Sequence, residues 1–319
     1  MKIAIVGCGA LGSYYGALLC RAGHETHFLL RSDYDAVRRD GVTILSPEGD
    51  IHVRPICART PEQIGPVALV VIGLKATAND IFPKVLPPLC GPDSLVLTLQ
   101  NGLGNEDAVA RAVGADRTLG GLCFVCLNRV APGTIVHSAH GVVVMGEYDG
   151  PSRPRTRHVA DTFTQAGIEC RVAENIIKAH WEKLVWNIPF NGLGVAGAAG
   201  FEAVETGKLT GRIGACLTTK DLLGDPRWER IVRDLMMETI GAARALGFDI
   251  PDAAADFQIN RTRAMGAYKA STLIDFERGQ PLELESLFGE PLRQAQKAGA
   301  KCPRLEKLCG LLEQMGQRA

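Results

Sequence analysis

The sequence lacks a net charge, a block of like charges and a long apolar run. Lys and Arg together number 35, as do Asp and Glu, so no basic stripe is available for nucleic acid or an anionic membrane. No apolar run approaches the roughly 20 residues that cross a bilayer. These absences predict a small-molecule substrate and neither a nucleic-acid nor a membrane partner.

The sequence also lacks a secretory signal pattern. Residues 2–6 form an apolar run too short for one, and they lead directly into a glycine loop, so we expect a cytoplasmic protein. Ten cysteines are scattered along the chain. Cys123 and Cys126 form its C-x-x-C, but in an extended strand this odd separation points the two thiols to opposite faces. We therefore expect buried, inert cysteines and no metal site.

Short runs rich in Val, Ile and Leu predict strands buried on both faces. These runs are residues 2–6, 26–30, 67–73 and 95–99. A helix over 10–22 lies between the first two, and strands that alternate with helices indicate a parallel, doubly wound sheet. Two hairpins are predicted from turn-forming residues, one pairing 42–45 with 51–54 and one pairing 134–137 with 142–146.

The pattern becomes helical in the second half of the chain. The predicted helices are residues 174–188, 203–216, 227–246, 252–267, 284–298 and 303–316. A length of 319 residues suits two domains. The predicted fold class is therefore α/β, with an N-terminal Rossmann-type doubly wound parallel sheet over residues 1–172 and a mostly α-helical domain over residues 173–319.

A glycine motif follows the first strand and opens the first helix. It reads Gly7, Cys8, Gly9, Ala10, Leu11, Gly12. In a strand–helix–strand unit such a G-x-G-x-x-G predicts dinucleotide binding: the glycines permit a tight turn, close approach of the pyrophosphate, and close packing of helix on strand. The helix N-terminus would then offer N–H groups to the phosphates. The alternative is a glycine-rich turn without a ligand.

The residue that ends the second strand predicts which cofactor is used. NAD-preferring sites carry Asp or Glu there, whereas this sequence has Arg31, whose planar guanidinium matches a phosphate. Arg31 therefore favours NADP and a role at its 2′-phosphate. Asp33, two residues later, keeps NAD open, and a solvated surface arginine is the other alternative.

Polar residues also end two further strands. Lys75 follows the run that ends at Leu74, and Gln100, Asn101 and Gly102 follow the run that ends at Leu99. Ligands of open α/β sheets bind outside the carboxyl ends of the strands. Each residue alone could be an ordinary polar residue at the end of a strand, but together they indicate a cofactor site at the carboxyl ends of the strands.

The second half carries a polar row on a helix of large apolar residues. Lys183, Asn187 and Asn191 are spaced by four residues and share one helical face. Pro189 should bend or end this helix, because it cannot donate a backbone hydrogen bond. The alternative is an ordinary solvated face of an amphipathic helix.

Taken in order and spacing, these motifs resemble the ketopantoate reductase (2-dehydropantoate 2-reductase) family. The resemblance rests on the glycine motif, Leu74-Lys75, the Gln100-Asn101-Gly102 segment and the row at Lys183. It extends to Ser271 in Ser-Thr-Leu-Ile-Asp and, twelve residues later, to Glu283 in Leu-Glu-Leu-Glu. The resemblance therefore covers essentially the whole chain.

The resemblance implies NADPH-dependent reduction of a 2-keto acid to a 2-hydroxy acid, with ketopantoate converted to pantoate in pantothenate and coenzyme A biosynthesis. It implies that Lys183 is the general acid, that Asn187 and Asn191 hold the substrate, and that Ser271 binds its carboxylate. Glu283 would contact the cofactor and help to fix the catalytic centre. Lys75 and Asn101 would lie at the nicotinamide end.

The implied chemistry suits the residues. Hydride delivery to a ketone builds negative charge on its oxygen, and a lysine ammonium is protonated at neutral pH without special tuning. A nearby carboxylate such as Glu283 would help to keep it charged.

The sequence departs from the family pattern at Phe201 and Phe288, where family members often carry asparagine, and at Ile274, where glutamine is frequent. These departures concern the choice of 2-keto acid more than the reaction class. Two other readings remain open: a different Rossmann dehydrogenase of the hydroxyacid or opine type, and a catalytically silent NADP-binding sensor. The oligomeric state is also open, with a homodimer among the options.

Overall fold

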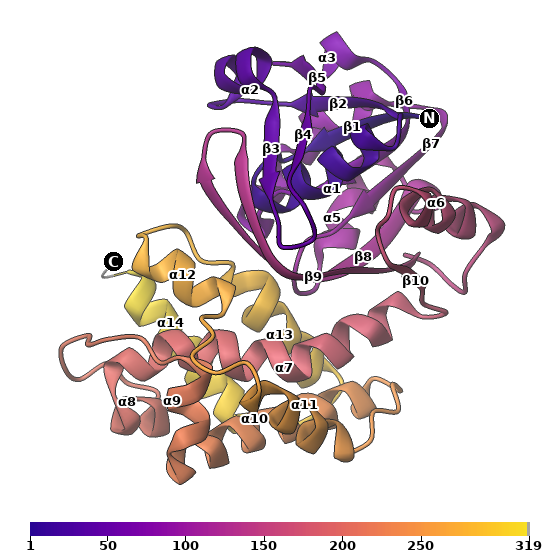
Figure 1. The fold of residues 1–319 in the computed structure, drawn as a ribbon. Helices are drawn as coiled ribbons and strands as arrows, with labels where there is room; N and C mark the ends of the chain where they lie inside the picture. Colours follow the sequence, from indigo (N-terminus) through magenta and orange to yellow (C-terminus); the bar gives the residue numbers. More distant parts are fainter. Residues whose placement is uncertain (318–319) are drawn as a thin grey trace. The chain divides into compact units, whose positions relative to one another are not determined.

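The computed structural model describes residues 1–317, which fall into two compact units divided between Ile177 and Lys178 (Figure 1). The first unit is built on a sheet, and the second is built from helices. Each unit is described by itself.

Six parallel strands form the centre of the first unit. The parallel arrangement and the strands near 2–6, 26–30, 67–73 and 95–99 confirm the prediction, whereas the strand at Ile56–Ala58 was not predicted. Their order across the sheet is β5-β2-β1-β6-β7-β8, which is the strand order of a Rossmann dinucleotide-binding domain. They are β1 (Lys2–Val6), β2 (Glu25–Leu29), β5 (Ile56–Ala58), β6 (Val67–Ile72), β7 (Cys90–Thr98) and β8 (Thr118–Ala131). The direction of the strand order reverses between β1 and β6, so the crevice for a ligand is expected at their carboxyl ends.

The sheet is mixed rather than purely parallel. Beyond β8 the strand β9 (Thr134–Glu147) pairs antiparallel, and β3 (Val42–Leu45), β4 (Ile51–Val53) and β10 (Cys170–Val172) complete that side. The β3–β4 hairpin confirms the first predicted hairpin.

The second predicted hairpin is wrong, because 134–137 and 142–146 lie on the same strand, β9, which pairs with β8. His140 and Gly141 have positive φ angles of 66° and 147°. The register of β9 against β8 slips beside them, between the pairs Phe124–Val142 and Val125–His140. The turn-forming residues therefore produce a β-bulge instead of a turn.

Helices cover both faces of the central strands. Alternate residues of β1 point to opposite sides: Ile3 and Ile5 belong to one buried cluster, and Ala4 and Val6 belong to another. Helices α1 (Ala10–Arg21) and α6 (Pro154–Gln165) contribute to the first cluster, and α3 (Pro61–Ile64), α4 (Phe82–Val85) and α5 (Asn105–Val113) contribute to the second. The short helix α2 (Tyr34–Asp40) follows β2.

The second unit consists of helices around a long buried one. Its helices are α7 (Ile176–Ala196), α8 (Phe201–Thr206), α9 (Thr219–Gly224), α10 (Pro226–Ala245), α11 (Ala253–Arg263), α12 (Ser271–Glu277), α13 (Glu290–Lys297) and α14 (Pro303–Gly316). Capping follows the sequence locally. Asp225 accepts the Arg227 backbone N–H at the start of α10, and Glu238 of α10 accepts the N–H groups of Arg304 and Leu305 at the start of α14.

Two helical predictions need correction. The predicted helix 203–216 ends early, because Gly207 takes a left-handed conformation (φ 72°) that terminates α8. Of the two outcomes expected at Pro189, a bend or an end, the end is wrong, since α7 continues to Ala196. The flanking residues Ile188 and Phe190 are fully buried, and their packing holds the helix together where Pro189 removes one backbone bond.

Over residues 1–317, no helix is long and apolar enough to cross a membrane, and no group of metal-ligating side chains could hold a metal ion. None of the ten cysteines forms a disulfide. Three of them, Cys123, Cys302 and Cys309, are buried, whereas the other seven are half-buried, so the expectation of uniform burial is wrong.

A buried ion pair joins the end of β9 to α6. The carboxylate of Glu147 accepts hydrogen bonds from Arg155 (Nη2, 2.6 Å; Nε, 3.1 Å) and from the hydroxyl of Thr156. Burial alone would raise the pKa of the Glu147 carboxyl, but these bonds outweigh it and hold that pKa below its ordinary value. These hydrogen bonds to Glu147 therefore stabilise the first unit only while its carboxylate is ionised.

We expect Glu147→Gln to lower the free energy of unfolding by about 2 kcal/mol at pH 7, since charged hydrogen bonds are lost. A carboxyl whose pKa is depressed by folding contributes its stability above its unfolded pKa and loses that contribution as the pH falls through its folded pKa. The difference from the parent should thus shrink below about pH 4. Urea unfolding of both proteins at pH 7 and pH 3.5 measures this. An equal difference at both pH values would contradict the assigned role.

Candidate cofactor and substrate sites

The glycine motif lies where β1 ends and α1 begins. Gly7 has a positive φ of 95°, and a Cβ added there would lie 2.7 Å from the carbonyl carbon of Gly73. A Cβ on Gly12 would collide with the carbonyl oxygen of Gly7, and one on Gly73 would lie 2.8 Å from the Gly12 nitrogen. Three backbones therefore touch at this junction. Gly73 was not singled out by the sequence analysis.

Gly9 behaves differently from its neighbours. A Cβ at Gly9 would meet no atom of the chain within 4 Å, so nothing within the protein requires glycine there. Gly9 is the N-cap of α1, no side chain caps that helix, and its first turn holds no acidic residue. The unpaired N–H groups of this turn thus face an open, uncapped space that suits an anion.

Cys8, between the two glycines, points inward. Its thiol donates to the carbonyl oxygens of Ile5 and Leu29 at 3.5 Å each, and burial raises the pKa of this thiol well above its usual range. Cys8 therefore ties the loop to β1 and β2 and is not a reactive nucleophile.

The two charged residues after β2 have opposite environments. Arg31 is exposed, and in the described part of the chain its guanidinium makes no hydrogen bond or ion pair. Asp33 is only 6% exposed, and its carboxylate is bound by Arg129 of β8 through Nε (2.9 Å) and Nη2 (2.5 Å). Arg31 is thus available to a ligand, whereas Asp33 is engaged.

Lys75 and Asn101 follow β6 and β7 at the same edge of the sheet as the glycine loop. Val6 of β1 pairs with Ile72 of β6, and Ile72 pairs in turn with Thr98 of β7, so these strands end side by side. The structure therefore brings together at one edge the cofactor residues that the sequence predicts: Gly7, Gly9, Arg31, Lys75 and Asn101.

A chain of side-chain amides joins the segments after β6 and β7. The Thr98 hydroxyl donates to Gln100 (2.8 Å), Gln100 to Asn79 (2.7 Å), Asn79 to Asn105 (2.9 Å), and Asn105 to the backbone carbonyl of Asn101 (2.9 Å). Each amide accepts from one neighbour and donates to the next. Asn79 and Asn105 were missed by the sequence analysis, because nothing in their local pattern marks them.

In the second unit, the predicted polar row lies on α7 inside a buried environment. Asn187 and Asn191 are 5% and 3% exposed, and Lys183 is half-buried. The Asn191 amide donates to the Asn187 oxygen at 3.4 Å, which is consistent with their sharing one helical face. Among the described residues the Nδ2 of Asn187 has no hydrogen-bond partner. The solvated-face alternative is therefore wrong for the two asparagines.

Ser271 joins this row from α12, although it is 80 residues away in the sequence. The Oδ1 of Asn191 accepts the Ser271 hydroxyl at 3.2 Å and the Thr272 backbone N–H at 3.0 Å. The structure thus brings together Asn187, Asn191 and Ser271. Thr272, which holds Asn191 through its backbone, was not predicted.

Glu283 is buried, 6% exposed, just before a π-helical turn over Glu285–Gly289. Single π-turns inside helices are often found at functional sites. Phe288 in this turn is fully buried, and its ring would be struck by a Cβ on Gly192 of α7 (2.9 Å). Leu308 lies still closer to that position (2.6 Å), so Phe288 is a packing residue that, with Leu308, leaves little room for a side chain at position 192.

Phe201, a second departure from the family pattern, begins α8. Its ring contacts Trp228 edge to face at 5.1 Å between centroids, and the Arg227 guanidinium lies 5.0 Å from its centre. Phe201 thus belongs to an aromatic cluster with the start of α10.

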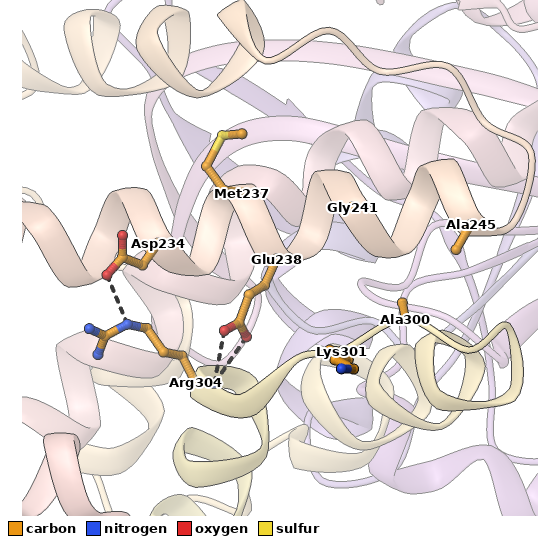
Figure 2. A pocket seen from close by; sticks show the side chains of 8 residues that line it. All are labelled: Asp234, Met237, Glu238, Gly241, Ala245, Ala300, Lys301 and Arg304. Carbon is orange, nitrogen blue, oxygen red and sulfur yellow. Dashed lines mark hydrogen bonds and ion pairs between the residues drawn. The ribbon is translucent and has the colours of Figure 1, made fainter.

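A hollow of about 510 Å³ in the second unit lies apart from these residues (Figure 2). Asp234, Met237, Glu238 and Gly241 of α10 line one side, and Lys301 and Arg304 line the other. Figure 2 shows Asp234 and Glu238 directed at Arg304, and both bind it. The charged groups therefore join α10 to α14, and no predicted site residue lines this hollow.

The glycine loop yields a paired test. We expect Gly9→Ala to leave the melting temperature unchanged but to raise the Kd of a nicotinamide dinucleotide by about tenfold or more, because the methyl group would enter the space expected to hold the pyrophosphate. Gly12→Ala should instead lower stability by about 2 kcal/mol or more, since its methyl group collides with backbone. Calorimetric titration and thermal unfolding measure both. Parent-like dinucleotide binding by Gly9→Ala would show that the pyrophosphate does not lie over Gly9.

Comparisons with known proteins agree with this geometry. The family model described as ketopantoate reductase PanE/ApbA matches residues 3–150, and the model of its C-terminal domain matches residues 175–316. A dinucleotide-binding sheet followed by a helical unit defines a class of two-domain oxidoreductases. The chain belongs to the ketopantoate reductase family, whose members are pyridine-nucleotide-dependent reductases.

Relatives match over nearly the full length. The 2-dehydropantoate 2-reductase of Nostoc sp. is 38% identical over 96% of this chain and 92% of its own. The crystal structure of the Geobacter metallireducens 2-dehydropantoate 2-reductase matches with a TM-score of 0.90 and 41% identity, over 98% of this chain and 99% of that one. The Methylococcus capsulatus enzyme matches with a TM-score of 0.86 and 32% identity, over 100% and 97%.

A D-mandelate dehydrogenase crystallised with NADH and anilino(oxo)acetate shares the fold. It matches with a TM-score of 0.86 over 100% of this chain and 99% of its own, at 18% identity. This likeness shows a shared fold.

Proposed function

We propose that this chain catalyses the NADPH-dependent reduction of ketopantoate to pantoate. The observation that carries the proposal is the hydrogen-bonded set Asn187, Asn191 and Ser271, assembled from α7 and α12 in a chain of the ketopantoate reductase family. When bound, the nicotinamide cofactor supplies the hydride. The residues of this chain bind, orient and protonate.

NADPH rather than NADH is supported by the environment after β2. Arg31 is exposed and makes no ion pair in the described chain, so its guanidinium can bind a 2′-phosphate. The uncapped start of α1 and the open space at Gly9 suit the pyrophosphate. Lys75 and Asn101 are assigned to the nicotinamide end, where the amide chain through Asn79 and Asn105 holds the backbone of Asn101.

The substrate is assigned to the polar row of the second unit. The unpartnered Nδ2 of Asn187 can donate to the keto oxygen or to a hydroxyl of the substrate. The single proton of the Ser271 hydroxyl, donated to Asn191 here, would turn to the substrate carboxylate, while the Thr272 N–H continues to hold Asn191. We assign to Lys183 the proton transfer to the nascent alkoxide, and to Glu283 the fixing of the catalytic centre.

The substrate assignment is tested by measuring NADPH oxidation at 340 nm with ketopantoate, pyruvate, 2-ketoisovalerate and phenylglyoxylate. Ketopantoate should give the highest kcat/KM, and NADPH should exceed NADH by about tenfold or more, the scale of one lost charge-assisted contact. A higher kcat/KM with another keto acid would overturn the substrate, and no turnover with any of them would overturn the reaction class.

The proton donor is tested with Lys183→Ala. Loss of a general acid acts in the transition state, so kcat and kcat/KM should fall together by about 10²–10⁴-fold while the NADPH Kd stays unchanged. Lys178→Ala is the matched control, because Lys178 lies on the same helix and pairs with Glu182 on its surface. That control should keep kcat within about twofold. A folded Lys183→Ala enzyme with near-parent kcat would refute the assignment.

A further inference from the structure

Asp33 is an acidic residue two positions after Arg31, close to the strand end at which acids normally select NAD. It lies just beyond β2, the strand after which NAD-binding Rossmann domains place an Asp or Glu for the ribose hydroxyls. An unoccupied carboxylate here would accept from the 2′-hydroxyl of NADH and would repel the 2′-phosphate of NADPH.

The carboxylate of Asp33 is, however, engaged by three hydrogen bonds. Arg129 donates through Nε to one oxygen (2.9 Å) and through Nη2 to the other (2.5 Å), and the Ser32 hydroxyl donates at 2.9 Å. These bonds fill most of the roughly four lone-pair positions of a carboxylate and leave little capacity for a ribose hydroxyl.

These donors act strongly enough to keep Asp33 ionised although it is buried. Burial alone would raise the pKa of the Asp33 carboxyl, but the bonds from Arg129 and Ser32 outweigh it and lower that pKa. The charge is therefore present, and Arg129 is the cation that compensates it.

Arg129 comes from a distant part of the chain that is held firmly in place. Arg129 and Gly133 belong to the tip of the β8–β9 hairpin, 96 residues or more after Asp33. The Gly133 carbonyl accepts the Thr43 N–H at 2.8 Å, and a Cβ on Gly133 would lie 2.8 Å from the Gly41 oxygen. The hairpin tip is thus seated against the start of β3, which positions Arg129 over Asp33.

We propose that Arg129 determines cofactor specificity indirectly. Its ion pair with Asp33 makes the Asp33 carboxylate unavailable to the ribose hydroxyls and compensates its negative charge. Arg31 is then the residue that recognises the 2′-position of the cofactor. This inference rests on the proposed NADPH dependence. Arg129 is a positioning residue, since it acts through Asp33.

The test compares binding of 2′,5′-ADP and 5′-AMP, which differ in the discriminating phosphate, by calorimetric titration without catalysis. In Arg129→Leu the 2′,5′-ADP Kd should rise by about tenfold or more, the effect of one uncompensated like charge, whereas the 5′-AMP Kd should change less than about twofold. Removing the charge in Arg129→Leu/Asp33→Asn should restore the preference for 2′,5′-ADP. Arg129→Gln carries the same expectation should Arg129→Leu not fold.

Arg155→Leu is the matched control. This variant also breaks a bidentate pair with a buried acid, Glu147. That pair lies at the other end of the strands, because Glu147 pairs with Leu119 at the start of β8. It should lower stability and leave the ratio of the two Kd values unchanged.

Three results would overturn the inference. They are an unchanged ratio of the 5′-AMP Kd to the 2′,5′-ADP Kd in Arg129→Leu, an equal fall of that ratio in Arg155→Leu, or no recovery of the ratio in the double variant. A parent protein that binds both nucleotides equally would instead overturn the NADPH assignment itself, and this inference with it. The failure of the inference alone is therefore distinguishable, because the parent would still prefer 2′,5′-ADP.

Discussion

The contact between three backbones at Gly7, Gly12 and Gly73 is the constraint on which the first unit depends. A Cβ on any one of these glycines would overlap the backbone of another. The segments at the end of β1, at the start of α1 and after β6 can therefore approach this closely only because all three positions are glycine. This close approach brings the start of α1 to the crevice where the strand order reverses. Gly9 takes no part in that packing, because a Cβ there would meet no atom of the chain within 4 Å, and its lack of a side chain suits the proposed position of the pyrophosphate.

Local pattern was sufficient to predict elements whose geometry is set by neighbouring residues. The strands β1, β2, β6 and β7, the helix α1 and the β3–β4 hairpin follow from apolar runs and turn residues, and they lie as expected. The same reasoning failed at His140 and Gly141, because turn formers also suit a bulge, and only the pairing of β9 with β8 decides between them. It failed again at Gly207, where a glycine in a helical pattern acts as a C-terminal stop.

The residues of the candidate sites also fall into two groups, those that local spacing predicts and those that depend on distant partners. Spacing on one helix predicted that Asn187 and Asn191 share a face, and their hydrogen bond agrees. Asn79, Asn105 and Arg129 could not be predicted, because each acts through a partner at least 20 residues away in sequence. Their chemistry is ordinary amide and guanidinium bonding, and only the folded topology gives it a place. The position of Ser271 beside Asn191 was reached through family resemblance and not through spacing.

The lengths of the strands at the margins of the sheet affect how readily two copies of the chain can associate through their sheets. An exposed strand edge presents unpaired backbone groups that can template pairing between chains. In the described structure the strands at the margins of this sheet, β4, β5 and β10, are only three residues long each. Of the long strands, β9 pairs with β8 along one side and, over parts of its length, with β3 and β10 along the other. β8 pairs with β7 only over Thr118–Gly120. The three-residue strands therefore offer little edge for pairing between chains, and the longer edge that the described pairing leaves open is the part of β8 beyond Gly120.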